Sequence, residues 1–475
     1  MLEPSARREL VLLLGGDPLF DDPSHRRVYD ADAYAFAGIQ PDAIVLPSTA
    51  RCVEQIVGWC HRQGIPYVAR GAGTGLSGGC LTAEGGILIG TARLNRILEI
   101  DPFERVARVE PGVVNTQLNR RAARHGLSFA PDPSSQNACT VGGNFAENSG
   151  GPHTLKNGVT LPHVLGVSLV GERGRRIELG GRHLPGSGAD LLALSVGSEG
   201  CAGIAVELLL RLIPLPTAVE TFLIVYDELA DAARSVSAMV AAGILPAAME
   251  LIDQVMLRAV EKAFSFGFPL DAGGVLIVEV DGEAESVAED SRQLRAVCES
   301  FGAREIRQAA TEAERAHLWK ARKHSFGAIG RVSPNYATQD GVVPRASVPE
   351  IVRCIRETSA RHDIGIGTVI HAGDGNIHPC VLFDNRKPEQ VKAALAASAE
   401  ILERCIELEG SPSGEHGIGL EKRRFMGRLF GFDDLAAMEE IRASFDPSGL
   451  CNPGKVLPGP GGCGELRALG RQVPQ

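Results

Sequence analysis

Residues 70–79 read RGAGTGLSGG, and this stretch decides which fold the chain can adopt. It contains a G-x-G-x-x-G pattern at Gly73, Gly75 and Gly78, directly after the apolar segment IPYVAR, which predicts a strand. A Rossmann dinucleotide fold requires a helix that opens at the third glycine. Here the following residues, CLTAEGGILIG, have no helical period and predict a loop and then another strand. The context therefore argues against a Rossmann fold.

The same glycines suit a different kind of anion site. Residues without side chains let consecutive backbone N–H groups point one way, which forms a nest that a pyrophosphate can approach closely. Arg70, Thr74 and Ser77 could add donors to it. A mobile surface loop is the alternative interpretation.

Two further stretches are rich in glycine and small polar residues. They read PDPSSQNACTVGGNFAENSGG (131–151) and VGSEGCAGI (196–204) and offer little side chain from which to build a core. Three such stretches in one region favour a large ligand with many polar edges, made of a phosphate chain, a ribose or ribityl and a flat ring.

The order of predicted elements indicates two or three domains, as expected for 475 residues. Strands and helices alternate from residue 38, with an amphipathic helix on Val53, Ile56, Val57 and Cys60 that should stop at Gly64. Residues 165–179 predict a hairpin. A strand–helix pattern restarts at 221, which predicts an antiparallel or mixed sheet covered by helices.

Composition excludes several classes of function. The net charge of −10 provides no basic field for nucleic acid or an anionic membrane. No apolar run is long enough to span a bilayer, and the N-terminus reads as an amphipathic helix rather than a signal peptide. The eleven cysteines form no C-x-x-C motif, which favours a reducing cytosol and argues against an iron–sulfur cluster or zinc ribbon in this chain.

The segment HAGDGNIHP (371–379) lies between two predicted strands. Asp374-Gly375 is a type I′ turn signal, and a two-residue turn there would place His371 opposite His378. Facing residues have Cβ atoms about 4.5–5.5 Å apart, so the two imidazoles could share a metal ion. A solvated hairpin face is the alternative.

A third ligand would favour the metal site. SPSGEHGIGLEK (411–422) offers Glu415 and His416 between glycines. With Glu415 as ligand the metal would keep open positions for substrate, and His416 could act as a base. A zinc hydrolase would use the same three ligands, but it would leave the glycine-rich stretches unexplained.

The three glycine-rich stretches together resemble the flavin-binding domain of the vanillyl-alcohol oxidase / p-cresol methylhydroxylase superfamily, which binds FAD between two α+β subdomains without a Rossmann fold. Some members bind flavin covalently through a histidine in the glycine loop. Thr74 stands in this loop instead, which favours non-covalent FAD. The resemblance implies the following cofactor-binding residues: Arg70, Gly71, Ala72, Gly73, Thr74, Gly75, Leu76, Ser77, Pro131, Asp132, Pro133, Ser135, Thr140, Gly142, Gly143, Asn144, Asn148, Gly150, Glu199, Gly200, Ile204 and Asn452.

Four later motifs resemble the C-terminal half of FAD-linked D-2-hydroxy acid dehydrogenases, including the flavin subunits of bacterial glycolate oxidases. They are LWKARKHSFGAIGRVSPNYATQDGVVPR, HAGDGNIHP, SGEHGIG and DPSGLCNPGKVLP. This resemblance implies a divalent metal, with zinc favoured, on His371, His378 and Glu415. It further implies His416 as base and Arg322 as the residue that binds the substrate carboxylate, and we add Asn376 as a substrate-binding residue.

One position departs from that family. Relatives acting on D-2-hydroxyglutarate carry a lysine two positions before the residue matching Asp340, and this chain has Thr338. The departure favours a small monocarboxylate. Glycolate is the expected substrate and D-lactate the alternative, with D-2-hydroxyglutarate less favoured. A different class of function is a non-catalytic role in a larger electron-transfer complex.

The expected fold is α+β: a two-subdomain FAD-binding domain of the p-cresol methylhydroxylase type, an α+β substrate domain, and a C-terminal segment returning to the flavin. Electrons would pass to an iron–sulfur or second flavoprotein-like subunit or to another acceptor. The expected location is the cytoplasm, peripheral to the inner membrane through partner subunits. The expected ranges are 1–37 for a helical arm, 38–217 for the FAD domain, 218–430 for the substrate domain and 431–475 for the returning segment.

Overall fold

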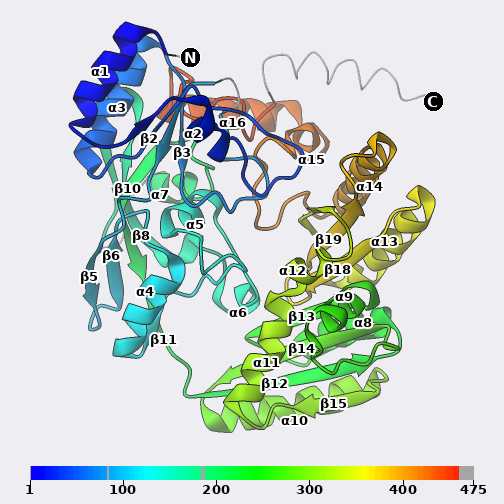
Figure 1. The fold of residues 1–475 in the computed structure, drawn as a ribbon. Coiled ribbons are helices and arrows are strands. Elements are labelled where there is room, and N and C mark those ends of the chain that lie inside the picture. The colour runs from blue at the N-terminus through cyan, green and yellow to red at the C-terminus, as the bar shows by residue number, and fades with distance from the viewer. Residues whose placement is uncertain (1, 83–84, 183–187, 459–475) are drawn as a thin grey trace. The chain divides into compact units, whose positions relative to one another are not determined.

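The computed structural model describes residues 2–82, 85–182 and 188–458 (Figure 1). Contacts group the chain into two compact units. Unit 1 comprises Met1–Ser149, Val159–Leu215 and Glu415–Gln475, and unit 2 comprises Gly150–Gly158 and Pro216–Gly414. Residues 150–158 thus group with the unit that contains the expected substrate domain, and residues 415–430 group with the unit that contains the expected FAD domain.

A four-stranded sheet forms the first part of unit 1, in the order β1-β2-β4-β3, with β2, β4 and β3 parallel. The predicted helix is α3, which starts after the N-cap Thr49 and stops at Gly64, whose φ of +64° suits glycine. The apolar face of α3 and Leu10 of α1 pack into the core of this sheet. The elements are α1 (Pro4–Leu14), β1 (Leu19–Phe20), α2 (Pro23–Val28), β2 (Ala43–Val45), α3 (Ala50–Gln63), β3 (Tyr67–Arg70) and β4 (Ile87–Gly90).

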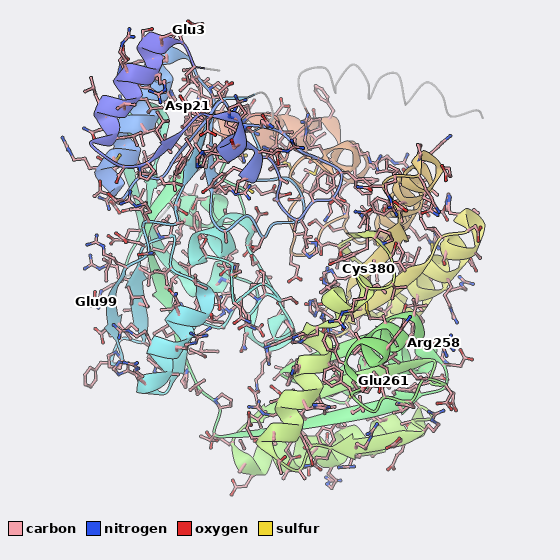
Figure 2. All side chains as sticks on the ribbon, viewed as in Figure 1. Glu3, Asp21, Glu99, Arg258, Glu261 and Cys380 are labelled. Atoms are coloured by element: carbon pink, nitrogen blue, oxygen red, sulfur yellow. The ribbon has the colours of Figure 1, made fainter. Side chains whose placement is uncertain are left out.

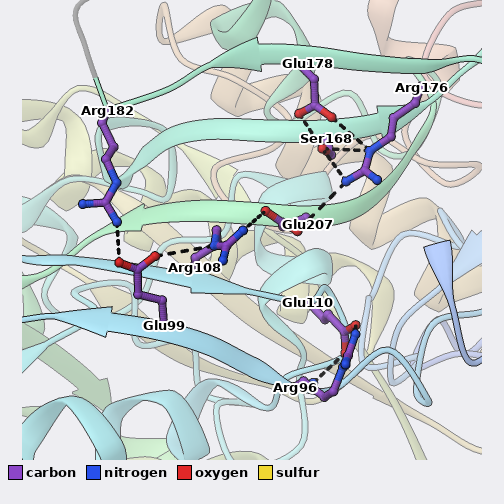
Figure 3. Close-up of polar contacts among 9 residues, drawn as sticks. All are labelled: Arg96, Glu99, Arg108, Glu110, Ser168, Arg176, Glu178, Arg182 and Glu207. Atoms are coloured by element: carbon purple, nitrogen blue, oxygen red, sulfur yellow. Dashed lines mark hydrogen bonds and ion pairs between the residues drawn. The ribbon is translucent and has the colours of Figure 1, made fainter.

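The second part of unit 1 is an antiparallel sheet in the order β5-β6-β10-β8-β9, and it includes the predicted hairpin as β8 and β9. One face is apolar and buried. The other carries cross-strand ion pairs, in which Arg108 lies 3.5 Å from Glu99 and 3.4 Å from Glu207 (Figure 3). The elements are β5 (Ile97–Asp101), β6 (Val106–Val109), α4 (Asn115–Ala122), β7 (Leu127–Ser128), α5 (Val141–Glu147), β8 (Val164–Val170), β9 (Arg176–Gly180), α7 (Leu191–Ser195), β10 (Ile204–Arg211) and β11 (Ile213–Pro214).

The C-terminal part of unit 1 returns to the edge of the first sheet. Cys451 pairs with Tyr67 of β3 in a parallel bridge, after the helices α15 (Met426–Leu429) and α16 (Phe432–Phe445). Arg442 of α16 donates to three carbonyls of this segment, those of Cys451 (3.2 Å), Asn452 (2.9 Å) and Lys455 (2.8 Å). The sequence beyond Pro458 is rich in glycine and proline, from which we expect a frayed tail, and it lies outside the described residues.

Unit 2 is built on one antiparallel sheet, in the order β15-β12-β14-β13-β18-β19-β16, with β17 also on β19. Its apolar layer beneath α9 includes Val369 and Cys380, the latter labelled in Figure 2. The elements are α6 (Thr154–Asn157), β12 (Ala218–Tyr226), α8 (Leu229–Ala241), β13 (Ala248–Asp253), α9 (Gln254–Phe264), β14 (Gly274–Gly282), α10 (Ala284–Ser300), β15 (Glu305–Gln308), α11 (Glu312–Lys323), α12 (Ser325–Ile329), β16 (Asn335–Thr338), β17 (Gly341–Val342), α13 (Val348–His362), β18 (Ile366–His371), β19 (Asn376–Phe383) and α14 (Pro388–Glu407).

Within the described ranges, none of the helices combines the length and the apolar character needed to cross a bilayer.

The Arg442 contacts give a stability prediction. Arg442→Met leaves three carbonyls without their charged donor, so we expect the free energy of unfolding to fall by about 1–3 kcal/mol and amide exchange in 450–457 to accelerate. Arg428→Met on α15 is the control, because Arg428 makes no side-chain hydrogen bond among the described residues. Equal effects of the two substitutions in urea unfolding would contradict the proposed docking role.

Candidate functional site

The three glycine-rich stretches meet inside unit 1. A Cβ on Gly71 would lie 2.5 Å from Thr140 Oγ1, and one on Gly79 would lie 3.1 Å from Glu147 Oε1 and 3.5 Å from Glu199 Oε2. The contact at Gly71 requires glycine, and the absence of a side chain at both glycines lets the side chains of the other two stretches lie against the backbone of the first. As the sequence predicts, the described residues directly after Gly78 form no helix and lead into β4. The arrangement is a glycine-lined cradle of the kind that a phosphate-bearing cofactor needs.

One expectation about these stretches is wrong. Residues 131–151 were expected to contribute little to a core, yet they contain α5, whose Val141 and Phe145 are buried in the second sheet's core. Thr140 caps this helix by accepting from the Gly143 N–H at 3.2 Å. The many small polar residues around Val141 and Phe145 made this short amphipathic helix hard to predict from the sequence.

Several predicted cofactor residues use their side chains to hold the loops themselves. Asn144 accepts from Asn115 at 3.2 Å, and Asn148 accepts from the Leu161 N–H at 2.8 Å. The Arg70 guanidinium is buried and donates to the Ala31 carbonyl at 2.8 Å. Their direct contact with a cofactor stays a prediction; Gly150 falls in unit 2, whereas the other predicted cofactor residues belong to unit 1.

Asn452 ties the returning C-terminus to two of these stretches. Its Nδ2 donates to the carbonyls of Gly79 at 2.9 Å and Glu199 at 2.7 Å, and Lys455 donates to its Oδ1 at 2.9 Å. Burial lowers the pKa of Lys455 to about 8. This segment therefore completes the cradle from the far end of the sequence.

Glu199 holds the loop that follows His416, and Glu147 lies against it. Glu199 accepts from the N–H groups of Ile418 and Gly419, both at 2.6 Å. A Cβ on Gly417 would lie 2.4 Å from Glu147 Oε2. Burial, together with the neighbouring Glu199 carboxylate, raises the pKa of Glu147 well above its usual range.

In unit 2 the histidine hairpin differs from the prediction in register. His371 pairs with Asn376, and His378 pairs with Val369, because residues 372–375 form a four-residue connection rather than a two-residue turn at Asp374-Gly375. The two histidines still share one face as diagonal neighbours. Their ring centroids are 5.0 Å apart, at an interplanar angle of 85°, and both side chains are buried.

The orientation of both rings follows from their Nδ1 partners. His371 Nδ1 lies 2.5 Å from Glu250 Oε1, and His378 Nδ1 lies 3.3 Å from the carbonyl oxygen of Gln339. A carboxylate and a carbonyl can only accept, so each Nδ1 carries a proton, and in the neutral form of each ring the lone pair would be on Nε2. This is the tautomer that a metal ligand needs.

Glu250 was missed by the sequence analysis. It is a fully buried carboxylate on β13, and its second oxygen pairs with Arg322 Nε. Burial alone would raise the pKa of Glu250, but Arg322 and His371 outweigh it, so the pKa lies below its usual range. The only signal in the sequence was an acidic residue in the middle of the apolar run AMELI.

Arg322 is 1% exposed, and its Nη1 and Nη2 atoms have no hydrogen-bond partner among the described residues. Asn376 donates to Asp340 Oδ1 at 2.7 Å, and its own Oδ1 has no hydrogen-bond partner in the part of the chain that the structure describes. Asp340 also accepts from the Gly414 N–H at 2.9 Å. Buried polar groups are normally satisfied, so these atoms indicate a polar ligand.

Glu415 and His416 are the first residues of the last segment of unit 1. Glu415 directly follows Gly414, so one peptide bond separates it from a residue hydrogen-bonded to Asp340. His416 Nε2 lies 4.0 Å from Glu415 Oε1.

A glycine-lined cradle with a separate sheet that carries a buried arginine and two oriented histidines is typical of a flavin-dependent oxidoreductase with a non-Rossmann FAD domain. Comparison with known proteins agrees. Residues 41–180 match the family described as "FAD binding domain", and residues 215–456 match "FAD linked oxidases, C-terminal domain". The chain therefore belongs to the FAD-linked oxidases.

Individual relatives cover nearly the whole chain. The glycolate oxidase subunit GlcD of Escherichia coli (strain K12) is 42% identical, over 93% of this chain and 88% of its own length. D-lactate dehydrogenase of Anaerostipes hadrus is 31% identical over 94% of each chain. The solved structure of p-cresol methylhydroxylase with bound substrate matches with a TM-score of 0.76 at 16% identity, covering 95% of this chain and 96% of that chain. This last likeness confirms the expected α+β fold of the p-cresol methylhydroxylase type.

The contact at Gly417 gives a prediction for the cradle. Gly417→Ala should lower the free energy of unfolding by about 1–3 kcal/mol more than Gly449→Ala. Both glycines have positive φ, +85° and +64°, but only Gly417 has neighbours where the methyl group would go. Because both variants place alanine at a positive φ, the difference between their unfolding free energies reports mainly the collision of the new methyl group with Glu147. Chemical denaturation measures both, and equal losses would contradict the packing described.

Proposed function

We propose that the protein oxidises a small 2-hydroxy acid, glycolate first, to the 2-oxo acid with FAD as the electron acceptor. The observation that carries this proposal is Arg322, a buried cation with two unpartnered nitrogens beside two oriented imidazoles. A planar fork of this kind suits a carboxylate, which can accept from both nitrogens. The names of the relatives, glycolate oxidase subunit and D-lactate dehydrogenase, support the substrate class.

The chain's own residues account for binding and proton transfer. Arg322 Nη1 and Nη2 hold the substrate carboxylate and so fix the position of C2. Asn376 Oδ1 can accept a hydrogen bond from the substrate. A ring nitrogen of His416 accepts the proton of the 2-hydroxyl while the C2–H bond breaks and a C=O bond forms.

The three glycine-rich stretches and Asn452 would hold FAD non-covalently, since the loop offers Thr74 rather than histidine. When bound, the flavin supplies the site for the hydride and its two electrons. The cradle fits such a group because Gly71 and Gly79, which carry no side chains, bring the three stretches together and leave their own backbone uncovered by side chains of the first stretch.

A divalent metal, with zinc favoured, is part of the proposal. His371 and His378 fit as ligands because each presents Nε2 with its lone pair, and Glu415 would be the third. Such an ion acts as a Lewis acid that lowers the pKa of a hydroxyl group. Glu250 then serves as the carboxylate that orients a metal-bound histidine.

The substrate is proposed to be a monocarboxylate. Thr338 on β16 is buried, and its Oγ1 lies 3.5 Å from Cys380 Sγ, so this position supplies no positive charge for a second carboxylate. D-lactate is the second candidate, favoured by the D-lactate dehydrogenase relative, and D-2-hydroxyglutarate is the least favoured.

We propose further that electrons leave through a partner subunit or a soluble acceptor. The sequence has no C-x-x-C motif to hold a cluster of its own, and one relative is named as a subunit of a larger oxidase. A cytoplasmic location, at the inner membrane through such partners, belongs to the same proposal.

The substrate assignment is tested on the purified, flavin-loaded protein. Anaerobic addition of glycolate, D-lactate, L-lactate and D-2-hydroxyglutarate is followed by flavin absorbance. We expect bleaching with glycolate and D-lactate, because both are monocarboxylates and one relative is named D-lactate dehydrogenase; D-2-hydroxyglutarate differs by its second carboxylate and L-lactate by its configuration at C2. Selective bleaching by D-2-hydroxyglutarate would overturn the monocarboxylate proposal, and no bleaching by any of the four would overturn the function.

Substitutions at the adjacent residues Glu415 and His416 distinguish the proposed metal ligand from the proposed base. Glu415→Gln should lose bound metal, because a neutral amide is a weaker ligand. His416→Ala should keep both metal and flavin and lose turnover by about 10²–10⁴-fold. Metal analysis and steady-state rates measure both. Loss of metal from His416→Ala with retention in Glu415→Gln would reassign His416 as the ligand.

A further inference from the structure

A second buried carboxylate, Glu279 on β14, lies on the same sheet face as Glu250. Ile277 is directly opposite Glu250, and Glu279 lies two positions further along β14. The carboxylate is 4% exposed and close to four donors. Nothing in the proposed chemistry uses it, so its role needs an explanation.

The donors come from three different elements. Oε2 accepts from Trp319 Nε1 of α11 at 2.6 Å and from Thr221 Oγ1 of β12 at 2.7 Å, and Arg315 of α11 lies 3.5 Å away. Oε1 lies 3.3 Å from His153 Nε2, in the segment Gly150–Gly158. Although burial raises the pKa of Glu279, these contacts outweigh it and lower the pKa to about 2, so the group is ionised at working pH.

Helix α11 is thereby attached to the sheet along one face. Arg315, Trp319 and Arg322 recur at i, i+4 and i+7, and the first two contact Glu279 while the third contacts Glu250. Charge-assisted hydrogen bonds to a buried carboxylate are directional and strong. The rotation and height of α11 are therefore set at two points on the sheet.

The segment 150–158 reinforces this attachment. The His153 ring lies 5.7 Å from the Trp319 ring, and Lys156 donates to the Asp281 carbonyl at 2.7 Å. Leu155 packs against Gly373 in the connection between the two histidine-bearing strands, where a Cβ would lie 2.8 Å from it. One short segment thus contacts both the helix that carries Arg322 and the histidine hairpin.

We propose that Glu279 is a positioning residue that, through Trp319 and α11, aligns the Arg322 guanidinium with the substrate carboxylate. The inference rests on the proposed function. A bidentate contact tolerates little displacement, and misplacing a binding group by about 1 Å can cost as much as 10²-fold in rate. A change at Glu279 should therefore weaken carboxylate binding without contact between Glu279 and the substrate.

The structure offers a matched pair of substitutions. Trp319→Phe and Thr221→Val each remove one donor from the same oxygen, Glu279 Oε2, but only Trp319 lies on α11. In the full-length, flavin-loaded protein we expect similar losses of thermal stability. Trp319→Phe should raise KM for glycolate about tenfold with kcat changed less than twofold, whereas Thr221→Val should leave KM within twofold.

A binding measurement separates this inference from the proposed function. Oxalate has carboxylates but no C2–H to transfer, and its affinity is followed through the flavin spectrum. Trp319→Phe should weaken oxalate binding about tenfold, and in an Arg322→Lys background it should have little further effect. Equal effects of the matched pair, full additivity with Arg322→Lys, or no oxalate binding by the unmodified protein would overturn the inference.

Arg315→Met provides a second helix-side variant if Trp319→Phe fails to fold. It removes the more exposed donor from the same carboxylate, and we expect a smaller loss of oxalate affinity in the same direction. An unchanged affinity would count against the inference. Failure of every 2-hydroxy acid to bleach the flavin would overturn the proposed function and leave the oxalate comparison valid.

Discussion

The candidate site of unit 2 depends on one buried carboxylate, that of Glu250. Its two oxygens are divided between Arg322 and His371, so a single side chain orients the cation and the imidazole. A buried arginine without such a partner would be very unfavourable, and a histidine without one could present either nitrogen. With Glu250 in place, the Nε of Arg322 is occupied, and its terminal nitrogens remain for a ligand. Glu279 is a second buried carboxylate that contacts α11, and it lies on the neighbouring strand, two positions beyond the residue that pairs with Glu250.

In unit 1, carboxylate and amide side chains also accept or donate several hydrogen bonds at once, but their partners are backbone groups rather than side chains. Glu199 accepts from two consecutive N–H groups of the loop after His416, and Asn452 bridges two glycine-rich stretches. The glycine-rich loops can approach one another only because these side chains satisfy the polar groups that the approach buries. Several residues that the family resemblance assigns to a cofactor therefore use their side chains to shape the loops.

Local patterns in the sequence predict much of this structure. The helix on Val53, Ile56, Val57 and Cys60, its end at Gly64 and the exclusion of a Rossmann fold all follow from residues close together in the chain. Glu250 could not be found this way, since its partners lie 72 and 121 residues away. The prediction of the hairpin register was wrong for a similar reason. Gly375 has a φ of +79° and packs against Val343, the residue after β17, where a Cβ would lie 2.1 Å from the carbonyl oxygen, so a residue far away in the sequence constrains this loop.

The charges of the site argue for a cation beyond those the chain supplies. In unit 2, Glu250 and Asp340 contribute two formal negative charges, and Arg322 contributes one positive charge, which gives −2 + 1 = −1. A carboxylate substrate would have to enter against this negative charge, and in a low-dielectric interior that repulsion is large. The divalent ion proposed on His371 and His378 would offset this charge before the substrate binds. Under the proposed function, the ion would therefore make anion binding at Arg322 electrostatically feasible.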